Sequence, residues 1–123
     1  MFATAAAAYF GGGTAGEAWA AGLEQTPAGL VPPFELEARQ DGIAAVHAQT
    51  RWAEWRAIAL PTLRVKGERG FLPQAEADQM SATNPNARMV VIEDAGHDVH
   101  LDATEQLAIA ISTFIERAQS PTA

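Results

Sequence analysis

The pattern of apolar and polar residues changes near residue 60 of the 123-residue chain. Before that point, short helix-prone stretches rich in Ala are separated by Gly and Pro residues. After it, short apolar runs typical of strands alternate with stretches that have helical spacing. We therefore expect two parts, a helical segment at residues 1–58 and a strand–helix–strand–helix unit at residues 59–123.

The first segment predicts helices but no core of its own. Residues 11–13, all Gly, break the first helix, and the double proline within residues 29–33 predicts a loop. Trp52, Trp55 and Ile58 recur at spacings of three residues, so they share a helix face that suits packing against a larger body. The expected helices are residues 2–10, 15–23, 36–48 and 50–58.

Two short stretches in the second segment predict strands. Residues 62–66 place Leu63 and Val65 on one face, and Gly67 ends the run. Residues 88–93 contain four consecutive apolar side chains, which is typical of a buried parallel strand. The segment therefore contains two strands of one sheet.

Two helices accompany these strands. Residues 74–83 predict a helix with Ala77 and Met80 pointing inward. The last helix, residues 102–117, begins with a capping-box pattern in which Asp102 replaces the usual Ser or Thr. Its expected buried stripe is Leu107, Ile111, Phe114 and Ile115.

This order of elements predicts an α/β fold. Strand, helix, strand and helix with short connections imply a βαβ unit and a parallel sheet. Two strands are too few for a stable parallel sheet, because both faces and both edges need cover. We therefore expect one end of a larger sheet, whose unpaired edge predicts self-association of the chain.

Composition and charge argue against several classes of function. The net charge is −7 and the eight Lys and Arg residues are scattered, whereas a nucleic-acid partner needs clustered cations. We expect no membrane partner, since no apolar run reaches ~20 residues and no basic amphipathic stripe occurs. The apolar start lacks the positive leading segment of a signal peptide, so a cytoplasmic location is the default expectation. The absence of Cys removes disulfides and cysteine nucleophiles.

The densest polar cluster is residues 96–102, Gly-His-Asp-Val-His-Leu-Asp. It follows a predicted strand and precedes a predicted helix, and sites in open α/β sheets lie beyond the carboxyl ends of strands. A histidine there is suited to proton transfer, because imidazole gains and loses a proton near neutral pH. His97 is therefore a candidate for acid–base chemistry, with a structural or solvated histidine as the alternative.

Residues 61–68, Pro-Thr-Leu-Arg-Val-Lys-Gly-Glu, together with residues 84–102, closely resemble the last third of α/β-hydrolases. In that family, a Pro-Thr-Leu strand ending in Gly precedes an Ala-Gly-His turn, here residues 95–97, which carries the catalytic histidine. The last helix ends in an aromatic–aliphatic pair like residues 114–115. The resemblance covers roughly residues 55–117, and the preceding segment resembles, more loosely, the end of the helical cap over the active site.

The resemblance implies the C-terminal portion of an α/β-hydrolase fold, with the last two parallel strands and their flanking helices preceded by a helical cap segment. It implies that His97 is the catalytic general base, which takes a proton from the nucleophile and passes one to the leaving group. His100 does not match the catalytic position. The implied reaction is hydrolysis of an ester or related bond in a small-molecule substrate, without a cofactor.

The nucleophile departs from the family pattern. The chain has no Gly-x-Ser-x-Gly, and none of its three serines has flanking glycines at that spacing. Residues 12–16 have the pattern with Thr14 in place of Ser, but an Ala-rich stretch precedes them, so we expect a loop. In the family the nucleophile precedes the cap. We therefore expect it upstream of Met1, and we expect the isolated chain to be poorly active.

The acid of the triad also departs from the pattern. Many members carry Asp three residues after the glycine that ends the strand, and here that position is Gly70. Glu68 is close but offset, which makes it the weaker candidate. Other members place the acid before the cap, and we favour that arrangement, with the acid again upstream. An acid is needed to fix the imidazole tautomer and steady its charge.

Two other kinds of site compete with this interpretation. His97, Asp98, His100 and Asp102 offer metal donors within six residues, but their spacing matches no zinc signature. The glycines at residues 11–13 lack both the preceding strand and the Gly-Lys-Ser/Thr of a phosphate loop. We expect neither a metal nor a nucleotide.

A non-catalytic role is the main alternative. A short chain with a base and no nucleophile also fits a truncated α/β interaction module without activity of its own. Trp52 and Trp55 would then form an exposed apolar patch. Ester hydrolysis that depends on His97 separates the two interpretations.

Overall fold

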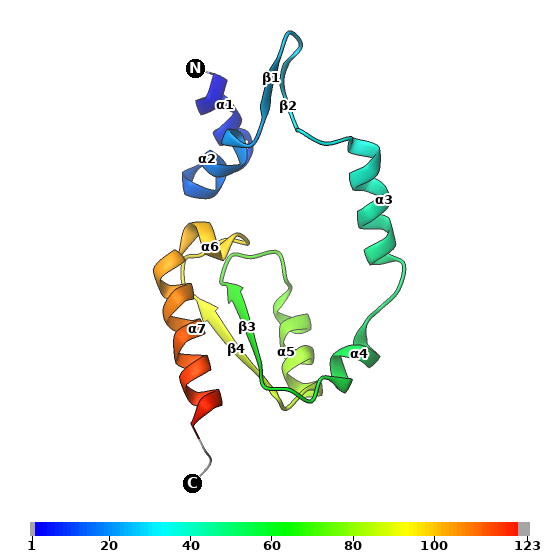
Figure 1. Cartoon of the computed structure of the whole chain (residues 1–123), viewed down its shortest axis with the longest axis vertical. Coiled ribbons are helices and arrows are strands. Elements are labelled where there is room, and N and C mark those ends of the chain that lie inside the picture. The colour runs from blue at the N-terminus through cyan, green and yellow to red at the C-terminus, as the bar shows by residue number, and fades with distance from the viewer. Residues whose placement is uncertain (1, 121–123) are drawn as a thin grey trace. The chain divides into compact units, whose positions relative to one another are not determined.

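The computed structural model describes residues 2–120, and the chain divides into two compact units, Met1–Arg51 and Trp52–Ala123. Its helices are α1 (Phe2–Tyr9), α2 (Gly13–Ala21), α3 (Leu36–His47), α4 (Trp52–Ala57), α5 (Gln74–Thr83), α6 (Val99–Asp102) and α7 (Thr104–Gln119). Its strands are β1 (Glu24–Thr26), β2 (Gly29–Val31), β3 (Thr62–Gly67) and β4 (Ala87–Ile92) (Figure 1).

The first unit opens with two closely packed helices, α1 and α2. Gly16 of α2 is buried, and a Cβ added there would lie 2.5 Å from the carbonyl oxygen of Ala7, so the close approach needs glycine. The predicted glycine break at residues 11–13 lies where α1 gives way to α2. These three glycines have φ values of 93°, 71° and 63°, which glycine adopts without strain.

The strands β1 and β2 form an antiparallel hairpin, so the predicted loop at residues 29–33 is wrong for its first three residues. At the turn, the hydroxyl of Thr26 donates to the carbonyl of Gly29 (2.9 Å) and accepts from the N–H of Ala28 (3.2 Å). Gly29 has a φ of 120°. Turn hydrogen bonds and a flexible glycine thus form a hairpin whose strands are too short to show alternation.

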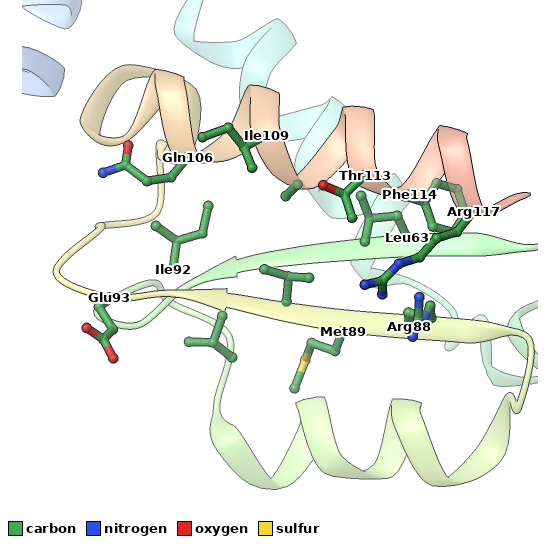
Figure 2. Close-up of a pocket in the computed structure, with 13 residues that line it drawn as sticks. Leu63, Arg88, Met89, Ile92, Glu93, Gln106, Ile109, Thr113, Phe114 and Arg117 are labelled. Carbon is green, nitrogen blue, oxygen red and sulfur yellow. The ribbon is translucent and has the colours of Figure 1, made fainter.

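The second unit is built on a parallel two-stranded sheet. Its register runs from Thr62 opposite Ala87 to Gly67 opposite Ile92. In Figure 2, α5 lies below the sheet and α7 lies above it, so these two helices lie on opposite faces. The predicted βαβ unit and the α/β class are confirmed.

The core of this unit lies where the sheet meets α6 and the start of α7. Ile92, Ala95, Val99 and Ala103 are buried together, and Val65, Val90 and Leu107 pack against them. Alternation along the strands explains the composition of this cluster, because Val65, Val90 and Ile92 share the face toward α7. Ala77 of α5 is fully buried and Met80 is half-buried, as predicted.

Two predictions about the last helix are wrong. Ile111 and Ile115 are 42% and 46% exposed, because Leu107, Ala110 and Phe114 occupy the face toward the sheet and the two isoleucines fall on its flank. The capping box does not form either. A separate short helix, α6, precedes α7, and no side chain caps the start of α7 at Ala103.

The helix α4 lies in the second unit, where Trp55 joins it to α5. The indole N–H of Trp55 donates to the carbonyl of Met80 (3.0 Å), and the guanidinium of Arg64 lies 5.5 Å from the indole ring centre. The side-chain amide of the fully buried Asn84 donates to the carbonyl of Trp55 (2.8 Å). Trp55, one of the residues predicted to pack, therefore contacts the rest of its unit.

Within residues 2–120, no helix has both the length and the apolar character required to cross a membrane.

Candidate active site

The loops that follow β3 and β4 lie side by side beyond the carboxyl ends of both strands, at the end of the sheet near α6 (Figure 1). Gly67, the last residue of β3, is buried. A Cβ added to it would clash with the carbonyl oxygens of Gly96 and Ala95. The glycine that ends the strand is therefore required for the close approach of the two loops.

Backbone hydrogen bonds fix the two loops to each other. The N–H of Glu68 donates to the carbonyl of Ile92 (3.0 Å), and the N–H of Arg69 donates to the carbonyl of Ala95 (2.9 Å). A tight turn follows, in which the N–H of Gly70 donates to the carbonyl of Gly67 (2.9 Å). The residues after this turn therefore have a defined position relative to the loop that carries His97.

Glu68 and Arg69 add side-chain bonds to the same junction. The carboxylate of Glu68 accepts a hydrogen bond from the backbone N–H of Asp94 (3.0 Å), and the guanidinium of Arg69 donates to the carbonyl of Asp94. Asp94 has a φ of 57°, a conformation uncommon for residues other than glycine. The carboxylate of Glu68, the residue after Gly67, thus binds the backbone of the loop that follows β4.

Asp102 holds the loop from the other side. Its carboxylate accepts a hydrogen bond from the N–H of Gly96 (2.8 Å), the residue immediately before His97. A Cβ added at Gly96 would lie 2.6 Å from the same carboxylate oxygen. Glycine at this position thus lets Asp102 reach the backbone, and the sequence pattern gave no sign of this bond because it assigned Asp102 to a helix cap.

His97 is exposed, and its ring stacks on that of Phe71. The ring centres are 4.5 Å apart and the planes are inclined by 17°. In the described chain, neither ring nitrogen of His97 forms a hydrogen bond. His100 is also exposed, but it lies within α6, where its carbonyl accepts from the hydroxyl of Thr104 (2.6 Å). The two histidines therefore have different surroundings, and Phe71 was not among the residues expected near His97.

The four donors of the alternative metal site are not brought together. Among residues 2–120, no three His, Cys, Asp or Glu side chains are grouped so that they could hold a metal ion. The carboxylate of Asp102 is instead directed to the N–H of Gly96.

The predicted pattern around Thr14 lies at the start of α2, in the first unit. The helix α1 precedes it, where the nucleophile turn of the family follows a strand. Of the serines, Ser81 donates to the carbonyl of Ala77 within α5, and Ser120 donates to the carbonyl of Glu116. Both hydroxyl groups therefore donate to carbonyls one helical turn back, and that of Ser81 also accepts from the guanidinium of Arg64 (3.4 Å).

A groove of about 670 Å³ lies between α7 and β4 and is separate from the histidine loop (Figure 2). It is lined mainly by apolar residues of β4 and α7, including Met89, Ile109 and Phe114, with Arg88 and Arg117 at one end. His97 and Phe71 are not among its lining residues. The groove is a gap between a helix and the sheet, and it holds none of the candidate chemistry.

Comparison with known proteins identifies the fold of this chain. No family model matches the chain, and no curated protein matches it. A solved structure, the crystal structure of E-2-(acetamidomethylene)succinate hydrolase, is similar to it with a TM-score of 0.76 and 25% sequence identity. The match covers 93% of this chain and 45% of the other, so this chain spans less than half the length of that hydrolase. The chain therefore has the fold of the C-terminal portion of an α/β-hydrolase, with the last two parallel strands and their flanking helices preceded by a helical segment.

Proposed function

We propose that this chain supplies the general base of a hydrolase that cleaves an ester or related bond in a small-molecule substrate, and that His97 is that base. One observation carries the proposal. His97 is exposed on a loop beyond the carboxyl ends of two parallel strands, in a chain with an α/β-hydrolase fold. Sites in α/β sheets lie at that edge.

The chemistry follows from an exposed imidazole whose ring nitrogens form no hydrogen bond within the described residues. One nitrogen takes the proton of a nucleophilic hydroxyl as that oxygen attacks the carbonyl carbon, and the same proton then passes to the leaving oxygen. The imidazole then takes a proton from a water molecule, which attacks the acyl group on the nucleophile and releases it as the carboxylic acid product. The other nitrogen donates to a carboxylate, which holds the tautomer and stabilises the imidazolium.

The nucleophile and the acid of this triad lie outside the chain, on this proposal. The serines whose bonds are described above bind their own helices, and Thr14 stands at the start of α2. Glu68 is the weaker candidate for the acid, and its carboxylate is already used by the N–H of Asp94. Both missing groups belong upstream of Met1, as the chain order of the family implies.

The similar protein, E-2-(acetamidomethylene)succinate hydrolase, is named for the compound that it hydrolyses. For this chain we propose the reaction class alone, since one scaffold supports many substrates.

The experiment is ester hydrolysis by the protein translated from the reading frame extended upstream of Met1. The change His97→Ala removes the base, and we expect kcat/KM to fall by about 10²–10⁴-fold. His100→Ala is the matched control, because His100 is also exposed and lies three residues along the chain. It should leave kcat/KM close to wild type. Equal losses in both variants, or no loss in His97→Ala, would show that His97 is not the base.

A non-catalytic interaction module is the second candidate, and the surface of α3 favours it. No residue of this helix is buried, and Leu36, Ile43 and Val46 are exposed. Within the described residues the parallel sheet has only two strands, which leaves strand edges for self-association. Sedimentation of the 123-residue chain separates the candidates: concentration-dependent oligomers without hydrolysis in the extended protein would favour the module.

A further inference from the structure

Phe71 is an exposed aromatic residue whose position does not come from burial in the core. Its side chain is 82% exposed, yet its ring lies against the imidazole of His97. An exposed phenylalanine gains little from burial, so its position here is set by the backbone and by the stacked ring.

The backbone brings Phe71 to this place. The hydrogen bonds from Arg69 to Ala95 and from Gly70 to Gly67 fix the turn immediately before it. A Cβ added to Gly70 would lie 3.6 Å from the Cα of His97, which is ordinary contact distance, so the turn passes directly beside the histidine. The stack therefore joins two loops that are already held together.

The stack restricts the imidazole without using its nitrogens. A histidine on a loop whose ring nitrogens form no hydrogen bond can occupy several staggered rotamers. With the planes inclined by 17°, the phenyl ring of Phe71 covers one face of the imidazole and leaves the edges that carry both nitrogens open. General-base catalysis needs this arrangement, because one edge faces the nucleophile and the other the acid.

We propose that Phe71 is a positioning residue for His97, whose stacked ring holds the imidazole in the orientation used for proton transfer. The catalytic meaning of this role rests on the function proposed for His97. The contact itself belongs to the 123-residue chain and is measurable there.

The first test is the proton NMR spectrum of the histidine side chains in the 123-residue chain, which has His47, His97 and His100. Phe71→Leu keeps an apolar side chain but removes the aromatic ring current. We expect the ring protons of His97 to lose an upfield displacement, while those of His47 and His100 stay unchanged. Phe71→Tyr restores an aromatic ring and should restore the displacement.

A matched control is Phe34→Leu, since Phe34 is exposed and lies in the first unit. It should leave the His97 signals at their wild-type positions. If Phe71→Leu also leaves them there, the rings do not stack in solution and the proposal is overturned.

The second test separates this proposal from the proposed function. In the extended protein, Phe71→Leu should lower kcat with little change in KM, and Phe71→Tyr should recover most of kcat. If His97→Ala abolishes hydrolysis but Phe71→Leu leaves kcat unchanged, the positioning role is wrong and the general base stands. If His97→Ala has no effect on hydrolysis, the proposed function fails, and Phe71 retains only its contact with the ring of His97.

Discussion

The two units of the chain differ in what holds them together. In the second unit, residues distant in sequence are joined by buried side chains and by hydrogen bonds between loops, as with Glu68 and Asp94. In the first unit, α3 has no buried residue, and exposed aromatic residues such as Tyr9 and Trp19 lie on α1 and α2. The candidate base lies in the unit whose backbone is fixed, which is where a side chain can be held for proton transfer.

The largest expected difference between the units is in local stability, measured by native-state hydrogen exchange. Amides of β3 and β4 should exchange on the order of 10²-fold or more slowly than those of α3, because the strands open only when the core of their unit opens. Mass spectrometry of peptides from residues 36–47 and 87–92 measures the exchange of α3 and of β4. Equal protection would mean that α3 is as well supported as the sheet.

Gly67→Ala should break the second unit most directly. The added Cβ meets two backbone carbonyls that cannot move without separating the loops, so we expect a loss of about 3 kcal/mol in the free energy of unfolding. The matched control is Gly42→Ala in α3, where nothing lies within 4 Å of the added Cβ. That change should stabilise the helix by up to ~1 kcal/mol. Urea unfolding measures both, and a harmless Gly67→Ala would contradict the close approach of the loops.

Asn84→Ala should have a smaller effect on the same unit. Asn84 is fully buried, and its side chain donates to the carbonyls of Trp55 (2.8 Å) and Ile58 (3.3 Å) and accepts from the N–H of Asn86 (2.9 Å). The change to Ala removes these three bonds. We expect a loss of about 2 kcal/mol. Asn86→Ala serves as the comparison, since its exposed side chain makes one bond, to Ile58 (3.3 Å). Similar losses in the two variants would show that burial of Asn84 adds nothing.

The smallest expected effect is that of Asp102→Ala. The exposed carboxylate accepts a hydrogen bond from the N–H of Gly96, so we expect a loss of about 1 kcal/mol in the free energy of unfolding in urea. Asp102→Asn keeps an oxygen acceptor and should lose less. If the Asn variant is as unstable as the Ala variant, the bond to Gly96 is not what Asp102 contributes.

The sequence predicted the elements whose pattern is local. Residues 62–66 were expected as a strand from the alternation of Leu63 and Val65, and residues 88–93 from a run of apolar residues typical of a buried parallel strand; β3 and β4 lie there. The position of His97 on the loop after β4 followed from the same pattern.

Contacts between distant residues were not predictable in the same way. The stack of Phe71 on His97 and the bond from Gly96 to Asp102 depend on how two loops meet, and no spacing in the sequence encodes that. The strands β1 and β2 have three residues each, too few for a periodic pattern to show. Ile111 and Ile115 were wrongly predicted to be buried. Helical spacing marks a broad apolar stripe, but it does not show which residues of the stripe lie at the centre of the packed face.

The measurement that tests the central claim most directly is the nucleotide sequence upstream of the codon for Met1. If His97 serves a nucleophile outside these 123 residues, the reading frame continues upstream and encodes Gly-x-Ser-x-Gly after an apolar strand. An in-frame stop codon with a ribosome-binding site immediately before Met1 would contradict the claim and would favour the interaction module.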